Sequence, residues 1–200
     1  MTTETVPIPG GREVVATHAS PEDATACVVA CPPHPEFGGH RGDPRLRAVT
    51  DALQDDGIAT LRFDYGAWDE GRGERADARN ALRWATDRYD HVGCFGYSFG
   101  GAIAVLAAAD ADPEPDAVSV LAPTAHLSTD LDATTSLEAV TCPVQVVVGT
   151  RDETADWRPV AHRARDLGHE VVELEADHHF VGQHDRITEA VVPFLSTHLI

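Results

Sequence analysis

The sequence contains no lysine, so all of its basic side chains other than histidine are arginines. Fifteen basic residues face 33 acidic ones, which gives a formal net charge of -18 at pH 7. This charge argues against nucleic acid or an anionic membrane as a partner, because both are themselves negative. The acids are spread along the chain, so they belong to the whole surface. Salt screens such self-repulsion, and we therefore favour a halophilic source over an ordinary acidic protein.

Long hydrophobic runs are also absent. No apolar run reaches the roughly 18 residues of a membrane span, and the start of the chain, MTTETVPIPGGRE, lacks the basic and apolar regions of a signal peptide. We therefore expect a soluble, cytoplasmic protein. The 200 residues have the size of one domain, and no repeat or long linker divides them. We expect a single domain over residues 1–200.

Cysteine is scarce, with four residues at positions 27, 31, 94 and 142 and no C-x-x-C pair. Three of them lie in or beside apolar runs that read as strands. We expect reduced and mostly buried thiols in preference to disulfides or metal ligands.

Short apolar runs alternate with helical patterns along the whole chain. This alternation predicts a mostly parallel sheet covered by helices on both faces, a three-layer αβα sandwich. Ligands bind beyond the carboxyl ends of the strands in such sheets. The predicted strands span 13–18, 25–32, 58–64, 91–98, 117–123, 142–150 and 169–176, and the predicted helices span 44–57, 75–89, 99–111, 158–168 and 185–200.

Ser98 lies at one of these strand ends, within the motif G-x-S-x-G at residues 96–100. A sharp turn between a buried strand and an apolar helix would place its hydroxyl on a protruding corner. The amide of Phe99, at the start of that helix, would face any anion formed beside the serine. We interpret Ser98 as a nucleophile in preference to a residue of a glycine-rich packing turn.

A neutral serine needs a base and a group that orients the base. Asp152 comes directly after the strand 142–150, and His178 comes after the last strand. The order Ser, Asp, His is that of α/β-hydrolases. Glu153 and Asp156 are alternatives for the acid, and His179 and His184 are alternatives for the base. Five other histidines with no assigned role are expected at the surface or in loops, namely His18, His40, His126, His162 and His169.

A second oxyanion donor is expected from the loop CPPHPEFGG at residues 31–39. Its prolines have no N–H, so the first available backbone amide is that of His34, and the next is that of Glu36. A rigid turn with only a packing role is the alternative for this loop. A zinc site from His178, His179 and His184 lacks a clear ligand spacing, so we expect no metal and no cofactor.

Several stretches match the motifs of one family. PPHPEFGG is similar to H-P-H-P-x-x-G-G with Pro32 in place of the first histidine, and GYSFGG matches the serine turn. GIATLRFDYGAWDEGRGE is similar to G-(I/V)-x-x-L-R-F-x-F-R-G-x-G-x-S-x-G, from which Tyr65 and the pair 67–68 depart, and ADHHF is similar to G-A-D-H-F-F. Over nearly its whole length the chain resembles the small dienelactone-hydrolase-like enzymes of the α/β-hydrolase superfamily.

The resemblance implies the α/β-hydrolase fold, with Ser98 as nucleophile, Asp152 as acid, His178 as base and the His34 amide as oxyanion donor. Dienelactone hydrolases themselves carry cysteine at the nucleophile position, whereas this chain has serine. Cys94 lies four residues earlier, inside the predicted strand, and does not replace it.

The segment between the strands 117–123 and 142–150 has room for a short helix but not for a lid domain. We therefore expect an open site and a small-molecule substrate, a short and accessible ester or thioester, cleaved by a carboxylesterase-like enzyme. Phe37, Trp68 and Phe99 either line the acyl pocket or belong to the core. Competing functions are a cofactor-free acyltransferase or haloperoxidase-like perhydrolase with the same triad, and an inactive binding protein of the same fold.

Overall fold

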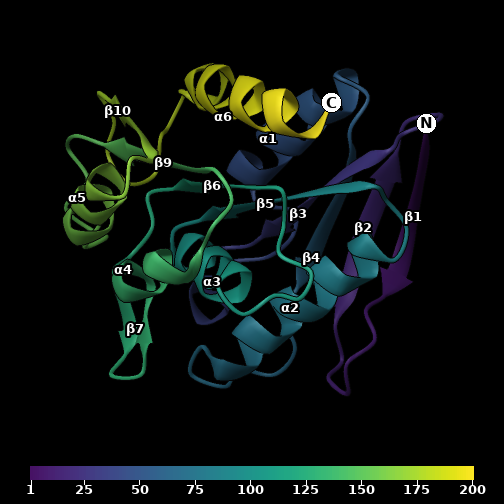
Figure 1. Ribbon diagram of the computed structural model, residues 1–200, viewed down its shortest axis with the longest axis horizontal. Coiled ribbons are helices and arrows are strands. Elements are labelled where there is room, and N and C mark those ends of the chain that lie inside the picture. The colour runs from purple at the N-terminus through teal and green to yellow at the C-terminus, as the bar shows by residue number, and fades with distance from the viewer.

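A computed structural model describes all of residues 1–200 and shows one eight-stranded sheet in the order β1-β2-β4-β3-β5-β6-β9-β10 (Figure 1). The strands from β4 to β10 pair in parallel, whereas β2 is antiparallel to both of its neighbours. The strands are β1 (Thr2–Pro7), β2 (Val15–Ser20), β3 (Ala26–Cys31), β4 (Ala59–Asp64), β5 (His91–Tyr97), β6 (Ala117–Leu121), β9 (Val144–Gly149) and β10 (Glu170–Leu174).

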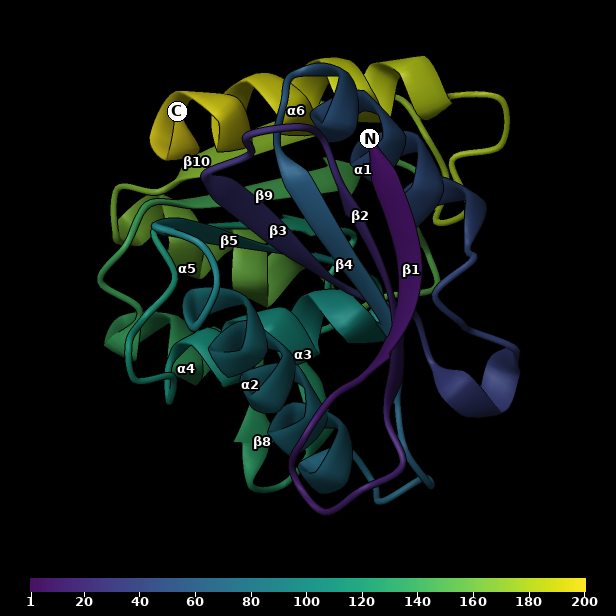
Figure 2. The ribbon, with the colours of Figure 1, turned by 90° about the vertical axis from the view of Figure 1, so that its right-hand side faces the viewer.

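Helices cover both faces of the sheet, as predicted. Figure 2 shows α1 and α6 on one side of the sheet and α2 and α3 on the other. The buried apolar residues form one cluster with side chains of α1 and α6 and a second with side chains of α2, α3 and α5. The helices are α1 (Pro44–Asp55), α2 (Arg72–Thr86), α3 (Phe99–Ala108), α4 (Ala133–Ser136), α5 (Arg158–Asp166) and α6 (His184–Leu199).

Helix α1 begins where its sequence predicts. The side chain of Asp43 accepts a hydrogen bond from the Arg45 amide, and Pro44 occupies the first turn. Leu46, Val49 and Leu53, which lie on one face at helical spacing, are fully buried. The cap and the apolar stripe together fix the helix against the sheet.

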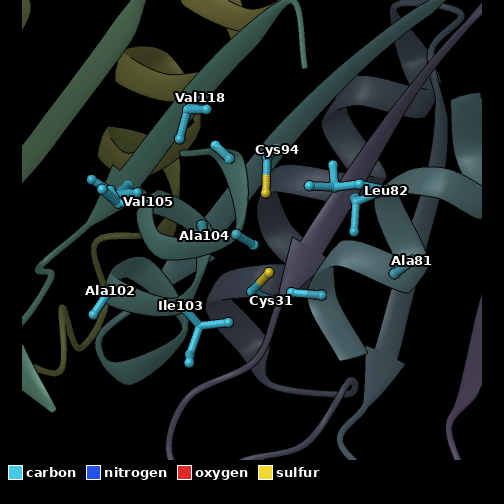
Figure 3. Packing of buried hydrophobic residues seen from close by; sticks show 14 of the residues in the cluster. Cys31, Ala81, Leu82, Cys94, Ala102, Ile103, Ala104, Val105 and Val118 are labelled. Carbon is cyan, nitrogen blue, oxygen red and sulfur yellow. The ribbon is translucent and has the colours of Figure 1, made fainter. Parts of the chain in front are cut away.

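Helix α3 is apolar all round and is packed in the core. Figure 3 shows Ile103 and Ala104 of this helix on the side that faces the thiols of Cys31 on β3 and Cys94 on β5. Both cysteines are free and fully buried, as predicted, and Cys142 is half-buried. The hydrogen bond with Cys94, together with burial, raises the pKa of the Cys31 thiol well above its usual value. These thiols therefore behave as small apolar groups of the core.

Strand β1 is absent from the sequence-based prediction. Its residues, TTETVP, are mostly exposed, and it pairs with β2 at the edge of the sheet. A strand that is polar on both faces does not show the alternation of apolar and polar residues by which strands are predicted. It is therefore recognised as a strand only from its pairing with β2 in the structure. Helix α2 also begins three residues earlier than predicted, because Glu74 accepts a hydrogen bond from the Gly71 amide at its start (2.8 Å).

The expectation that His18 lies at the surface is wrong. Its side chain is buried between β1 and α2, with Nε2 at 2.6 Å from the Tyr89 hydroxyl and Nδ1 at 3.2 Å from a carboxylate oxygen of Glu4. Its ring also packs edge-on against Trp84. Trp84 and Tyr89 cover the ring and the missed strand β1 contributes only the Glu4 contact, so burial of His18 depends on segments distant in the sequence.

The segment between β6 and β9 contains no lid domain. It forms a short hairpin, β7 (His126–Ser128) with β8 (Leu131–Asp132), and then α4 and a 3-10 turn, η2 (Leu137–Ala139). The short helix α4 fits the room that the sequence predicts in this segment, and the hairpin was not predicted. Among the helices of the structure, none has both the length and the apolar character that crossing a membrane requires.

Candidate active site

Ser98 occupies the turn between β5 and α3. Its backbone has φ 58° and ψ -120°, a conformation that non-glycine residues rarely adopt. A Cβ atom at Gly96 would lie 2.1 Å from the Gly100 carbonyl oxygen, and one at Gly100 would lie 2.2 Å from that of Cys31. Glycine is therefore required on both sides of the serine for the strand and the helix to meet at so sharp a turn.

Ser98, His178 and Asp152 form one hydrogen-bonded chain. The Ser98 hydroxyl oxygen lies 2.9 Å from Nε2 of His178, and Nδ1 of His178 lies 2.7 Å from Oδ2 of Asp152. In the tautomer with its proton on Nδ1, the imidazole donates to the carboxylate and can accept a proton from the serine. Asp152 is fully buried and His178 is 6% exposed, whereas Ser98 is partly accessible.

The Asp152 carboxylate has partners at both oxygens. Its Oδ1 accepts hydrogen bonds from the amides of Thr154 (2.8 Å) and Ala155 (3.0 Å), and its Oδ2 faces His178. Burial alone raises the pKa of a carboxyl group, but the hydrogen bonds from His178 and the two amides outweigh it and lower the pKa of Asp152. The group therefore stays ionised at neutral pH.

The alternatives that the sequence leaves open make no hydrogen bond to Ser98 or to the His178 ring. Only Asp152 and His178 are brought to Ser98. The side chains of the other candidates are exposed, and they belong to Glu153, Asp156, His179 and His184. No group of three or more His, Cys, Asp or Glu side chains has an arrangement that could hold a metal ion.

Tyr97 is a site residue that the sequence-based reasoning missed. Its hydroxyl donates a hydrogen bond to the backbone carbonyl of His178 (2.9 Å), and the two rings lie 5.5 Å apart. Burial raises the pKa of Tyr97 to about 12, so the hydroxyl stays a donor. The residue thereby holds the loop that carries the histidine, and its place inside the G-x-S-x-G motif is the signal that the sequence offers.

The two predicted oxyanion donors lie on neighbouring segments. The Phe99 amide is the first of α3 and has no partner within the helix. His34 precedes the 3-10 turn η1 (Pro35–Phe37), and its ring Nδ1 accepts a weak hydrogen bond of 3.3 Å from the Glu36 amide. The Glu36 amide is thus engaged within the loop, whereas the His34 amide makes no hydrogen bond within the chain. This difference favours His34 over Glu36 as a donor.

Ser98 and His178 open into a cleft of about 670 Å³ with one aromatic wall. The His34 ring lies 4.6 Å from those of Phe37 and Trp68 and 4.8 Å from that of Phe99, measured between centroids. Phe37 is 88% exposed and Trp68 is 38% exposed, whereas Phe99 is buried in the core and also lines the cleft. The structure therefore places Phe37 and Trp68 on the cleft and outside the core.

The rest of the cleft lining is mixed, with apolar Leu127 and Ala155 beside polar groups and one ion pair. Arg45 donates a hydrogen bond of 2.9 Å from Nε to Asp43 and another from Nη1 to the His179 carbonyl. Asp43 is the one carboxylate that lines the cleft, and it is already paired. Thr124, His126 and Thr154 provide further polar groups.

A buried cluster of charges holds the loop that carries Trp68. Asp77 accepts hydrogen bonds from Arg12 Nε (2.7 Å) and from the Gly66 amide (2.9 Å), and Arg12 donates to the carbonyl of the residue before Trp68. Glu74, like Asp77, is fully buried. Side chains of α2 and of the N-terminal segment thus hold in place the loop that carries Trp68 of the aromatic wall.

Known proteins share this fold. The chain is similar to an alpha-beta serine hydrolase homologue from Coxiella burnetii (26% identity, TM-score 0.83, 98% of each chain covered). It is also similar to the dienelactone hydrolase of Anabaena variabilis (24%, 0.82, covering 100% and 99%) and to an esterase of Pyrococcus furiosus (14%, 0.84, covering 100% and 92%). The comparison with curated proteins finds no match.

These similarities and the sheet order define an α/β-hydrolase fold without a lid domain, as predicted. Residues 62–186 match the family described as X-Pro dipeptidyl-peptidase (S15 family), and the chain belongs to this family. The match covers the segment from β4 to the first residues of α6, including Ser98, Asp152 and His178.

Proposed function

We propose that the protein is a serine hydrolase that cleaves carboxylic ester or thioester bonds of small substrates. The observation that carries the proposal is the continuous hydrogen-bonded chain from Ser98 through His178 to buried Asp152. The similarity to hydrolases and esterases of the same fold supports hydrolysis.

The geometry suits a two-step acyl transfer. Ser98 attacks the carbonyl carbon while its proton passes to Nε2 of His178, and the Phe99 and His34 amides hold the resulting oxyanion. The tetrahedral intermediate collapses, and the leaving alcohol or thiol takes the proton from His178. Water then attacks the acyl-enzyme and gives a proton to His178, which returns it to Ser98 as the carboxylic acid is released. Asp152 fixes the imidazole tautomer throughout.

Phe37 and Trp68 fit the acyl part of the substrate. Both rings are exposed on the cleft wall beside His34, so an apolar acyl group that covers them removes apolar surface from water. A dipeptidyl substrate has a free N-terminal ammonium group, which would need a carboxylate partner in the cleft. The one carboxylate that lines the cleft, Asp43, is already paired with Arg45. This pairing favours esters over the X-Pro peptides named in the family description.

A panel of substrates tests this proposal. Nitrophenyl esters and thioesters of graded acyl length are compared with X-Pro arylamides. We expect turnover of the esters and thioesters and little cleavage of the arylamides. Faster cleavage of the arylamides would replace the proposal with a peptidase. Addition of an acceptor alcohol, or of halide with peroxide, detects acyl transfer or haloperoxidase chemistry by the same triad.

Phe37→Ala is expected to weaken substrate binding without slowing the chemistry. Loss of the ring removes apolar contact with the acyl group, so KM for a medium-chain ester rises about 3- to 10-fold while kcat changes less than about twofold. Steady-state kinetics measure both. Val181→Ala is the matched control, because Val181 is 78% exposed but does not line the cleft. An unchanged KM for Phe37→Ala would remove this residue from the acyl site.

We also propose that the protein is adapted to high salt. The Debye length falls from about 30 Å at 0.01 M salt to about 3 Å at 1 M, so most carboxylates repel one another in dilute buffer and only near neighbours do in molar salt. Folding concentrates the net charge of -18, and screening therefore stabilises the folded state more than the unfolded chain.

The expected result is a melting temperature that rises from dilute buffer to molar KCl, with activity retained there. Sucrose at equal osmolality is the control, because it lowers the activity of water to the same extent but does not screen charge. A melting temperature that stays flat or falls in KCl would contradict the adaptation and leave the hydrolase proposal unaffected.

A further inference from the structure

Tyr65 lies directly after β4, beneath the loop that precedes His34. Its hydroxyl donates a hydrogen bond to the backbone carbonyl of Pro32 (3.0 Å). Pro32 and Tyr65 are both positions where the chain departs from the dienelactone-hydrolase-like motifs, and they lie 33 positions apart in the sequence. The structure joins these two departures in one contact.

The ring of Tyr65 contacts the other side of the site. It packs edge-on against the ring of Phe99, with centroids 5.8 Å apart, and edge-on against that of Phe63 at 5.2 Å. One side chain therefore touches both segments that carry the proposed oxyanion donors. It bonds the backbone two residues before His34, and it packs on the side chain of Phe99.

The Tyr65 hydroxyl is the hydrogen-bond donor that satisfies the Pro32 carbonyl. Pro32 is buried, and no other group in the chain donates to its carbonyl oxygen. The same oxygen lies against α3, because a Cβ atom at Gly100 would be only 2.3 Å from it. Pro33 and Pro35 have no N–H, so the backbone hydrogen bonds of this loop come from later amides, those of Phe37 and Gly39 to the His34 carbonyl, and none of them holds the Pro32 carbonyl.

The hydroxyl remains protonated under all ordinary conditions. Burial raises the pKa of Tyr65 well above its usual value, so the group stays a hydrogen-bond donor. A buried carbonyl that loses its donor either stays unsatisfied or turns toward another partner. Because rotation about the backbone near Pro32 would carry the His34 amide with it, the hydrogen bond and the donor position are linked.

We propose that Tyr65 is a positioning residue of the oxyanion hole, which it serves by holding the Pro32 carbonyl so that the His34 amide points into the cleft. This inference rests on the proposed hydrolase function. It adds a residue that touches no substrate and acts on the transition state through the backbone.

Tyr65→Phe tests the proposal, because it removes the hydroxyl and keeps the ring against Phe99. We expect kcat to fall about 10- to 100-fold with KM changed less than about threefold, since the lost alignment matters only when the oxyanion forms. Affinity for an aryl boronic acid, which forms a tetrahedral adduct on Ser98, should fall with kcat. Affinity for the carboxylic acid product and the pH profile of kcat/KM should stay unchanged.

Tyr89→Phe is the matched control. It also removes a hydroxyl that is hydrogen-bonded to a buried partner, Nε2 of His18 at 2.6 Å, and Tyr89 does not line the cleft. The control should lose stability but keep its kcat and its boronic acid affinity. Circular dichroism melting compares the two variants.

Two outcomes would overturn the inference. The first is wild-type kcat and boronic acid affinity in Tyr65→Phe. The second is an equal loss of both in Tyr89→Phe, which would make the effect one of stability alone. Wild-type protein without any esterase activity would overturn the proposed function and this inference together, so the two failures are distinguishable.

Discussion

Ser98→Ala and His178→Ala each lower kcat/KM for ester hydrolysis by about 10³-fold or more, with a melting temperature close to that of the wild type. Without the serine no acyl-enzyme forms, and without the imidazole no group in hydrogen-bond reach takes the serine proton. The oxyanion donors and the cleft remain, so a small residual rate above that in water is expected. Steady-state kinetics with a nitrophenyl ester give the ratio directly.

His179→Ala is the control for this prediction. The His179 ring lies 5.5 Å from that of His178, but its side chain is exposed and makes no hydrogen bond to Ser98. The variant should therefore keep nearly full activity. Near-normal turnover in His178→Ala, together with loss in His179→Ala, would shift the base by one residue.

Gly100→Ala destabilises the fold by about 4 kcal/mol or more, a large part of the roughly 5 to 15 kcal/mol that holds a domain together. Helix propensity alone predicts the opposite, because alanine is favoured over glycine within a helix by about 1 kcal/mol. The new Cβ would lie 2.2 Å from the Cys31 carbonyl oxygen and 2.3 Å from that of Pro32, both of which are backbone atoms. Urea unfolding measures the difference in the free energy of unfolding.

Gly57→Ala separates steric collision from backbone strain. Gly57 has φ +85° and nothing within 4 Å of an added Cβ, so its substitution costs only the strain of a left-handed conformation. That strain is about 1 to 2 kcal/mol. If Gly100→Ala were as stable as Gly57→Ala or the wild type, α3 would not approach β3 as closely as the structure has it.

The candidate triad was predictable because strand ends identify it. Asp152 and His178 each come after a strand of a parallel sheet, and the carboxyl ends of parallel strands meet at one edge of that sheet. Ser98 also lies in a local motif, whose two glycines are required because a Cβ atom at either position would collide with backbone atoms. Order along the chain, strand ends and turn chemistry were therefore sufficient to place three side chains that the structure joins by hydrogen bonds.

The contacts that the sequence did not reveal depend on pairing between distant segments. The hydroxyls of Tyr65 and Tyr97 bond backbone carbonyls 33 and 81 positions away, which no local pattern encodes. The same holds for Asp77, whose carboxylate accepts a hydrogen bond from Arg12, 65 positions away in the sequence. His18 was misplaced because its partners come from distant segments, with Glu4 in the unrecognised strand β1 and Trp84 and Tyr89 in and after α2.

Labelling with a fluorophosphonate probe tests the central claim most directly. The probe phosphonylates only a serine whose proton a neighbouring base removes, and peptide mass spectrometry locates the adduct. We predict one adduct, on Ser98, in folded wild-type protein, and none in urea-unfolded protein or in His178→Ala. Folded wild-type protein that shows no adduct on Ser98 would contradict the account and favour a binding protein of the same fold.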